Sequence, residues 1–104
     1  MTVKSGDGQY RDASGRRLVA VTGVGHLSCL GLSMHDAWQK VAAVESGIAR
    51  ITKFDVSQLN VKIAGEVRGL DFNQYLPSKL IREMDPFSSF AVIAAEQALR
   101  QGQL

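Results

Sequence analysis

The chain has 104 residues, of which 45% are apolar and 21% charged, and its net charge is +2. This length and apolar content predict one small globular domain at most and exclude a disordered chain. The excess of positive charge lies in the first residues, at Lys4, Arg11, Arg16 and Arg17, rather than on a clustered basic face, which argues against nucleic-acid binding.

Cys29 is the only cysteine, so no internal disulfide can form, and a reducing, cytoplasmic compartment fits. No apolar run approaches the roughly 20 residues of a membrane span, so we expect no membrane association. Two histidines and one cysteine without ligand spacing predict neither a metal site nor a cofactor. We expect residues 1–16 to be a disordered polar tail and residues 17–104 to form a partial domain.

The first element that the pattern predicts is a strand over residues 17–22. Residues 18–21 are apolar and rich in β-branched side chains, so both faces of this strand need cover, which indicates a parallel sheet in an α/β fold. Gly23, Gly25 and Gly31 follow, and we expect them to serve a tight turn. A dinucleotide-binding loop is disfavoured because Ser28 stands where its third glycine belongs.

A helix is predicted over residues 34–45, with Ser33 as its N-cap and Gly47 as its left-handed exit. Residues 48–60 show no period and predict a connecting segment. Residues 62–67 alternate polar and apolar side chains, which predicts a second, more exposed strand.

Pro77 opens a short predicted helix over residues 78–84, on which Lys79 and Arg82 share a face. Asp85 is predicted to cap a longer helix over residues 86–101, and this capping role is favoured over catalysis. Apolar side chains surround that helix almost completely, which is typical of a core helix packed on several sides. We therefore expect the chain to be part of a larger domain or to fold only with a partner.

The residues themselves reveal no catalytic set. Cys29 lies three residues from His26, but on a loop, and a buried, inert thiol is the favoured interpretation. The serines and carboxylates have no visible base partner.

Several short motifs nevertheless occur together in a fixed order: Val-Thr-Gly-Val-Gly at 21–25, Leu-Ser-Cys-Leu-Gly at 27–31, Ala-Trp at 37–38, Ser-Gly-Ile at 46–48, Phe-Asp-Val-Ser at 54–57, Lys-Ile-Ala-Gly-Glu-Val at 62–67 and Arg-Glu-Met-Asp at 82–85. From Arg17 onward the chain resembles the N-terminal segment of a β-ketoacyl-acyl-carrier-protein synthase of the type II condensing enzymes. The resemblance implies a thiolase-like fold, in which residues 18–21 form a central strand and residues 86–101 the helix between two sheets.

The resemblance also implies a reaction in fatty-acid or polyketide synthesis. Such enzymes hold an acyl chain on a cysteine, decarboxylate malonyl-acyl carrier protein and join the two units, using a Cys-His-His set. In the family this set lies beyond position 104, and Cys29 stands where the family usually has proline. We therefore carry over no catalytic residue and expect the segment alone to be inactive.

Partners are implied as well. Lys79 and Arg82 match basic positions that hold the acidic acyl carrier protein in relatives, although Glu83 replaces a residue that is often basic there. The resemblance further implies the remainder of the synthase and a second subunit, in a homodimer or heterodimer. Two alternatives stay open: a non-catalytic partner similar to a chain-length factor, and a self-associating interaction module.

Overall fold

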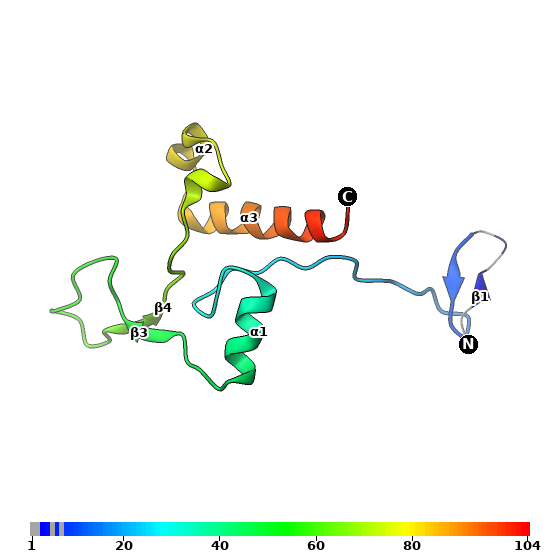
Figure 1. The fold of residues 1–104 in the computed structure, drawn as a ribbon, viewed down its shortest axis with the longest axis horizontal. Helices are drawn as coiled ribbons and strands as arrows, with labels where there is room; N and C mark the ends of the chain where they lie inside the picture. Colours follow the sequence, from blue (N-terminus) through cyan, green and yellow to red (C-terminus); the bar gives the residue numbers. More distant parts are fainter. Residues whose placement is uncertain (1–2, 5, 7) are drawn as a thin grey trace.

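The computed structural model describes residues 3, 4, 6 and 8–104, which form short strands and helices joined by irregular segments (Figure 1). The elements in chain order are strands β1 (Val3–Lys4) and β2 (Tyr10–Arg11), helix α1 (Met34–Ala42), strands β3 (Ile48–Arg50) and β4 (Ile63–Gly65), the 3-10 helix η1 (Phe72–Gln74), and helices α2 (Ser78–Glu83) and α3 (Pro86–Gln101). The described strands form two separate antiparallel pairs, β1–β2 and β3–β4. The mixture of helix and strand agrees with the α/β class, whereas the parallel sheet is absent from the described residues.

The described part of residues 1–16, expected as a disordered tail, carries the β1–β2 pair and a turn. Val3 pairs with Arg11 and Lys4 with Tyr10. The Asp12 carboxylate closes the turn by accepting from the Ser14 hydroxyl at 2.6 Å and from the Arg16 amide at 3.0 Å. The Ser14 hydroxyl, and then the Arg16 amide, hold the pKa of Asp12 below its ordinary value.

The prediction of a strand over residues 17–22 is wrong for this structure. Arg17 makes one isolated bridge to Arg11, and the chain then runs as a long single stretch beside no other strand (Figure 1). Val19 is 91% exposed and Val21 is 81% exposed. The reason is physical: a strand exists only through pairing, and the described residues offer this segment no parallel neighbour.

Helix α1 begins as the sequence predicts and ends earlier. Ser33 is its N-cap, and the Ser33 hydroxyl accepts from the Asp36 amide at 3.2 Å. The helix ends at Ala42 because the chain leaves it at Val44, whose φ of 58° is left-handed. The exit is therefore not made by Gly47.

The hairpin of β3 and β4 contains one predicted strand and one that the pattern missed. Ile48 pairs with Gly65, and Arg50 with Ile63. β4 lies inside the predicted range 62–67, whereas β3 lies in the segment interpreted as a connection. The long loop between them buries Val56.

Helices α2 and α3 lie close to their predicted ranges. Pro77 immediately precedes α2 in extended conformation, rather than being its first helical residue. Asp85 is the N-cap of α3 and Pro86 its first residue, and the Asp85 carbonyl accepts from the Ser88 and Ser89 amides; the Asp85 side chain makes no capping bond. α3 ends at Gln101, one residue before Gly102.

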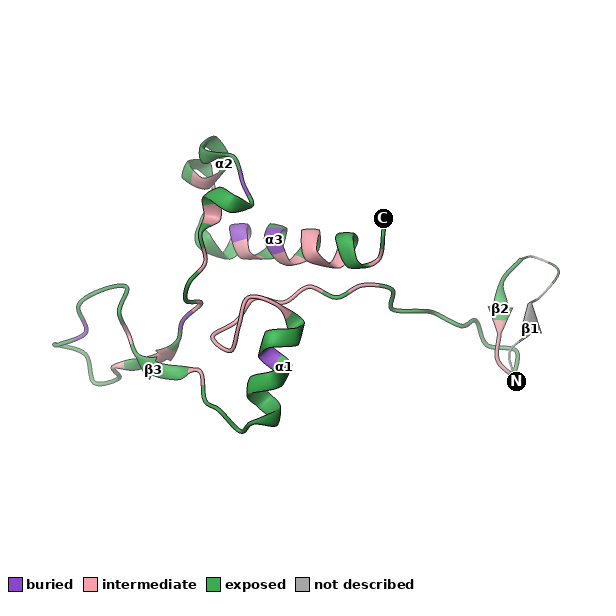
Figure 2. Ribbon diagram, in the orientation of Figure 1, coloured by how far each residue is buried: buried purple, intermediate pink, exposed green. Residues whose placement is uncertain are grey.

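The chain is open rather than densely packed. Its radius of gyration is 19.4 Å, against about 13 Å for a compact domain of this length. Among the described residues, burial is confined to scattered positions, two of them on α3 (Figure 2): the buried residues are Ala37, Val56, Glu66, Leu76, Ser89 and Ile93. On α3, Ile93 is fully buried while Phe87 is 72% exposed and Leu99 is 52% exposed. The helix that the pattern predicts to be covered on several sides is therefore covered on one.

Candidate functional site

Helix α2 presents the two basic residues singled out in the sequence. Lys79 and Arg82 are three residues apart, and both side chains are exposed. No ion pair among the described residues involves either of them. Glu83 is exposed beside them, so the three charged side chains leave one net positive charge on a short helix. This arrangement suits an encounter with an acidic surface and has no geometry for proton or group transfer.

The 3-10 helix η1 holds α2 in place. The two elements lie against each other, and the Ser78 hydroxyl of α2 bonds to the Asn73 side-chain oxygen at 3.3 Å. Leu76, in the connection, is buried. Phe72 of η1 stacks on Phe90 of α3, with ring centroids 5.8 Å apart and planes inclined by 18°. The stacked pair ties the base of α2 to the long helix.

A buried carboxylate, missed in the sequence, organises the nearby loop. Glu66 is 7% exposed, and it accepts from the Thr52 amide at 3.0 Å, the Thr52 hydroxyl at 3.0 Å and the Lys53 amide at 3.2 Å. The Arg68 guanidinium lies 3.8 Å away. Burial alone would raise the pKa of Glu66, but these hydrogen bonds and the charge of Arg68 outweigh it and hold the pKa below its ordinary value. A lone acidic residue directly after a short strand carries no sequence signal for such a role.

Gly23 and Gly25 follow the segment predicted as a strand over residues 17–22. They allow the backbone to lie close to a helix, and they do not adopt a left-handed conformation. A β-carbon at Gly23 would overlap the Ala98 carbonyl oxygen, and one at Gly25 would overlap the Ala94 carbonyl oxygen. Neither glycine has a positive φ. Gly31 lies against α1, where a β-carbon would come within 3.1 Å of the Ala37 amide nitrogen. The expected tight turn is present at Gly31, whose carbonyl accepts from the Ser28 amide at 3.0 Å and whose amide donates to the Ser28 carbonyl at 3.2 Å. Gly23 and Gly25 instead make a docking contact with α3, because only glycine lets two backbones come this close.

Two glutamines of α3, also missed in the sequence, bond to this docked segment. The Gln101 side-chain oxygen accepts from the Val24 amide at 2.7 Å. Gln97 accepts from the His26 amide at 3.0 Å and donates to the Leu32 carbonyl at 2.7 Å. The four-residue spacing of Gln97 and Gln101 places them on one helix face, and this spacing was the only available signal.

The residues around Cys29 form a packed turn and not a nucleophilic site. The His26 ring bonds to the Ser28 hydroxyl at 2.6 Å, and no hydrogen bond joins it to the thiol. The half-buried Cys29 lies against two glycines: a β-carbon would come within 2.7 Å of its sulfur at Gly47 and within 2.9 Å at Gly65. The thiol expected to be buried is therefore only half-buried, and its inertness stays a prediction.

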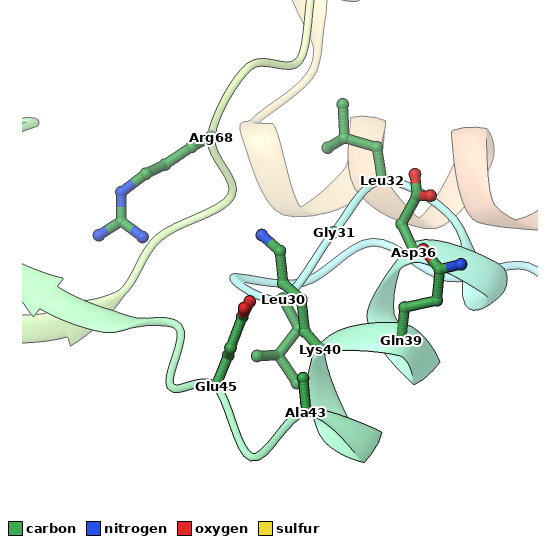
Figure 3. Close-up of a pocket in the computed structure, with 9 residues that line it drawn as sticks. All are labelled: Leu30, Gly31, Leu32, Asp36, Gln39, Lys40, Ala43, Glu45 and Arg68. Atoms are coloured by element: carbon green, nitrogen blue, oxygen red, sulfur yellow. The ribbon is translucent and has the colours of Figure 1, made fainter.

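An open groove of about 580 Å³ lies between the 30–32 turn, α1 and Arg68 (Figure 3). Figure 3 shows Arg68 across the opening from Asp36 and Lys40. With Glu45, the lining holds two positive and two negative side chains, so its charge favours no class of ligand. Within residues 3, 4, 6 and 8–104, no three histidine, cysteine or acidic side chains gather to hold a metal ion. None of the helices described is long and apolar enough to cross a membrane.

Comparison with known proteins gives a consistent result. The family model described as "Beta-ketoacyl synthase, N-terminal domain" matches residues 16–104. A 3-oxoacyl-[acyl-carrier-protein] synthase 2 of Synechocystis sp. is 37% identical over 89 residues, which are 86% of this chain and 21% of that protein. Proteins of the same name from Vibrio cholerae and Coxiella burnetii are 38% and 43% identical, over 86% and 80% of this chain. The chain spans about a fifth of the length of these relatives.

Proposed function

The chain belongs to the family of β-ketoacyl synthase N-terminal domains, and on that premise we propose that it is the first part of a condensing enzyme. In this proposal the enzyme elongates an acyl chain held on a cysteine, using malonyl-acyl carrier protein as the two-carbon donor. The observation that carries the proposal is the family match, which covers residues 16–104. It confirms the resemblance drawn from the motifs and coincides with relatives named for this reaction.

The catalytic set belongs, in this proposal, to sequence outside these 104 residues. Among the described residues no base is hydrogen-bonded to the Cys29 thiol, and the His26 and Ser28 side chains near it bond to each other or to the backbone. We therefore expect the chain by itself to have no condensing activity and to act only within a complete synthase. A cytoplasmic location belongs to the same proposal, because the unpaired thiol fits a reducing compartment.

The exposed apolar surface supports the same proposal. Phe87 and Leu99 leave α3 open to solvent on the sides away from Ile93, and Val19 and Val21 are bare. The accessible surface is 7973 Å², against about 5,700 Å² for a folded protein of this mass. In a thiolase-like fold, the remainder of the synthase and a second subunit would cover this surface, and Val19 and Val21 would then gain strand partners.

A graft tests the proposed function directly. Residues 16–104 replace the matching segment of the Vibrio cholerae relative, and formation of 3-oxoacyl-acyl carrier protein from acyl and malonyl donors is measured. We expect the graft to form product and the 104-residue chain alone to form none. The parent enzyme is the control for assay and folding. Turnover by the chain alone, or an inactive graft that elutes and unfolds as the parent does, contradicts the proposal.

A further inference from the structure

The loop between β3 and β4 bends back over the hairpin directly after β3 instead of continuing straight. Gly65, at the end of β4, pairs with Ile48, so Glu66 lies at the start of β3. Thr52 lies two residues past the other end of that strand. Because a strand rises about 3.3 Å per residue, a straight continuation would carry Thr52 out of reach of the Glu66 side chain. The hydrogen bonds between them therefore require the chain to bend back over the hairpin.

The same bend brings Lys53 onto helix α3. The Lys53 amide is held by the Glu66 carboxylate at 3.2 Å, and the Lys53 ammonium lies 5.6 Å from the centre of the Phe90 ring. This distance is within the range of a cation–π contact. Lys53 therefore joins the hairpin to α3, because Glu66 holds its backbone amide and its ammonium lies over the Phe90 ring.

The contact continues from Phe90 to helix α2. Phe90 stacks on Phe72, the first residue of η1, and the Phe72 carbonyl accepts from the Leu76 amide at 2.9 Å. Asn73 of η1 bonds to Ser78 of α2. Each link is a direct contact, so a continuous series of contacts runs from the buried carboxylate to α2.

We propose that Glu66 is a latch that folds the 51–62 loop onto α3 and, through Lys53 and the stacked rings of Phe90 and Phe72, sets the position of α2. Glu66 is a positioning residue in this proposal, since it touches α2 nowhere itself. The link to a carrier protein rests on the proposed function, because that proposal supplies the partner of α2. The latch is a property of the described residues and stands without any carrier.

Amide hydrogen exchange in the full 104-residue chain, read residue by residue by NMR, tests the latch. In Glu66→Gln, we expect the Thr52 amide to exchange about tenfold faster, because it loses a charged acceptor. Amides of residues 72–83 should exchange about two- to fivefold faster, the range that loss of an exposed cation–π contact gives. The matched control is Glu45→Gln, which removes an exposed carboxylate and should change neither.

Lys53 variants separate the contact between Glu66 and the loop from the contact between Lys53 and the stacked rings. Lys53→Met keeps the stem and removes the charge, so we expect protection of Thr52 to persist and protection of residues 72–83 to fall. Lys53→Arg restores a cation over the ring and should restore that protection. If the amides of α1 also exchange faster in Glu66→Gln, that variant has unfolded, and the Lys53 variants then test the latch. An unchanged Thr52 amide in Glu66→Gln overturns the latch, and unchanged residues 72–83 in Lys53→Met overturn its link to α2. No carrier protein is present, so failure of the proposed function leaves these results unaffected.

Discussion

Gly25 lies so close to Ala94 that a β-carbon on the glycine would occupy the space of the alanine carbonyl oxygen. The two residues belong to segments almost 70 positions apart in the sequence. The contact fixes where the segment after residue 22 meets α3, and Gln97 and Gln101 then complete the hydrogen bonds of that segment. A main-chain contact of this kind has no side chain that could adapt to a substitution.

Substitution at this contact should therefore be costly. We expect Gly25→Ala to destabilise the chain by about 3 kcal/mol, the upper part of the range for overpacking, because a backbone carbonyl must move. The measurement is the midpoint of urea unfolding by circular dichroism. Gly6→Ala is the matched control, since a β-carbon at Gly6 meets no atom within 4 Å. Equal midpoints for the two variants would show that the close approach is not formed in solution.

Gln97 should be the most sensitive polar residue of α3. Gln97→Leu keeps the size of the side chain but leaves the His26 amide and the Leu32 carbonyl without partners. We expect a loss of about 2 kcal/mol in unfolding free energy, since half-buried polar groups lose their hydrogen bonds. Unfolding in urea measures the loss, and exchange of the His26 amide locates it. Gln39→Leu, on an exposed face of α1, should have little effect; a loss as large there would point to a general effect of leucine.

The proposed carrier contact predicts a charge effect. Lys79→Glu combined with Arg82→Glu, made in the grafted synthase, should weaken binding of acyl carrier protein about tenfold at low salt, chiefly through slower association. Surface plasmon resonance gives both rates. Lys40→Glu with Arg50→Glu changes the net charge equally at other exposed positions and should leave binding near that of the unmodified graft. A dissociation constant unchanged by the first pair would remove α2 from the contact.

Lowering the pH should remove the contribution of the Glu66 carboxylate to the free energy of unfolding. Its pKa is lower in the folded chain than in the unfolded one, so the unfolded chain binds more protons in that range and stability rises with pH there. The contribution is complete above the ordinary value of 4.5 and is lost as pH falls through the lower, folded value. Among the described residues, Arg68 and Lys53 are the charged residues beside this carboxylate.

The measurement is the difference in urea midpoint between the unmodified chain and Glu66→Gln across acidic pH. Asp12 and Asp55 also have lowered pKa values, but they are common to both proteins and cancel in the difference. We expect the difference to shrink as pH falls below 4.5. A difference that is constant over that range would mean that the charge of Glu66 contributes nothing.

The exposed apolar surface predicts the behaviour of the isolated chain. With Phe87 72% exposed and Trp38 62% exposed, we expect the purified chain to self-associate in a concentration-dependent way. Multi-angle light scattering measures this, and Phe87→Ser combined with Val92→Ser should reduce it. Recovery of a compact monomer at all concentrations would contradict the expectation.

Local signals in the sequence predicted the elements that local interactions form. Ser33 marks the start of α1 through its side-chain cap, and Pro86 after Asp85 marks the start of α3 as the first helical residue; both signals involve residues only a few positions apart. The strand over residues 17–22 failed for the opposite reason: its existence depends on neighbours that the described residues do not provide. β3 was missed because three residues are too few to show a period.

In the candidate site, too, the features that depend on local spacing were predicted, and those that depend on distant contacts were not. The shared face of Lys79 and Arg82 follows from helical spacing, and the structure shows both side chains exposed; their partner stays a prediction. The roles of Glu66 and Gln97 depend on contacts across 14 and 71 positions, which no local pattern encodes. Gly23 and Gly25 were identified as necessary, but for a turn, whereas the requirement comes from the helix that lies against them.

The packing around Cys29 limits how this part of the chain can evolve. Its thiol occupies the volume that a methyl group on Gly65 would need, and a methyl group on Gly47 would strike both the thiol and the Cys29 carbonyl. A bulkier residue at 65 therefore requires the Cys29 thiol to move or position 29 to become smaller, whereas at Gly47 the Cys29 backbone carbonyl also blocks a side chain. Among descendants of this sequence, substitutions at positions 29 and 65 should occur together, whereas glycine should be retained at position 47.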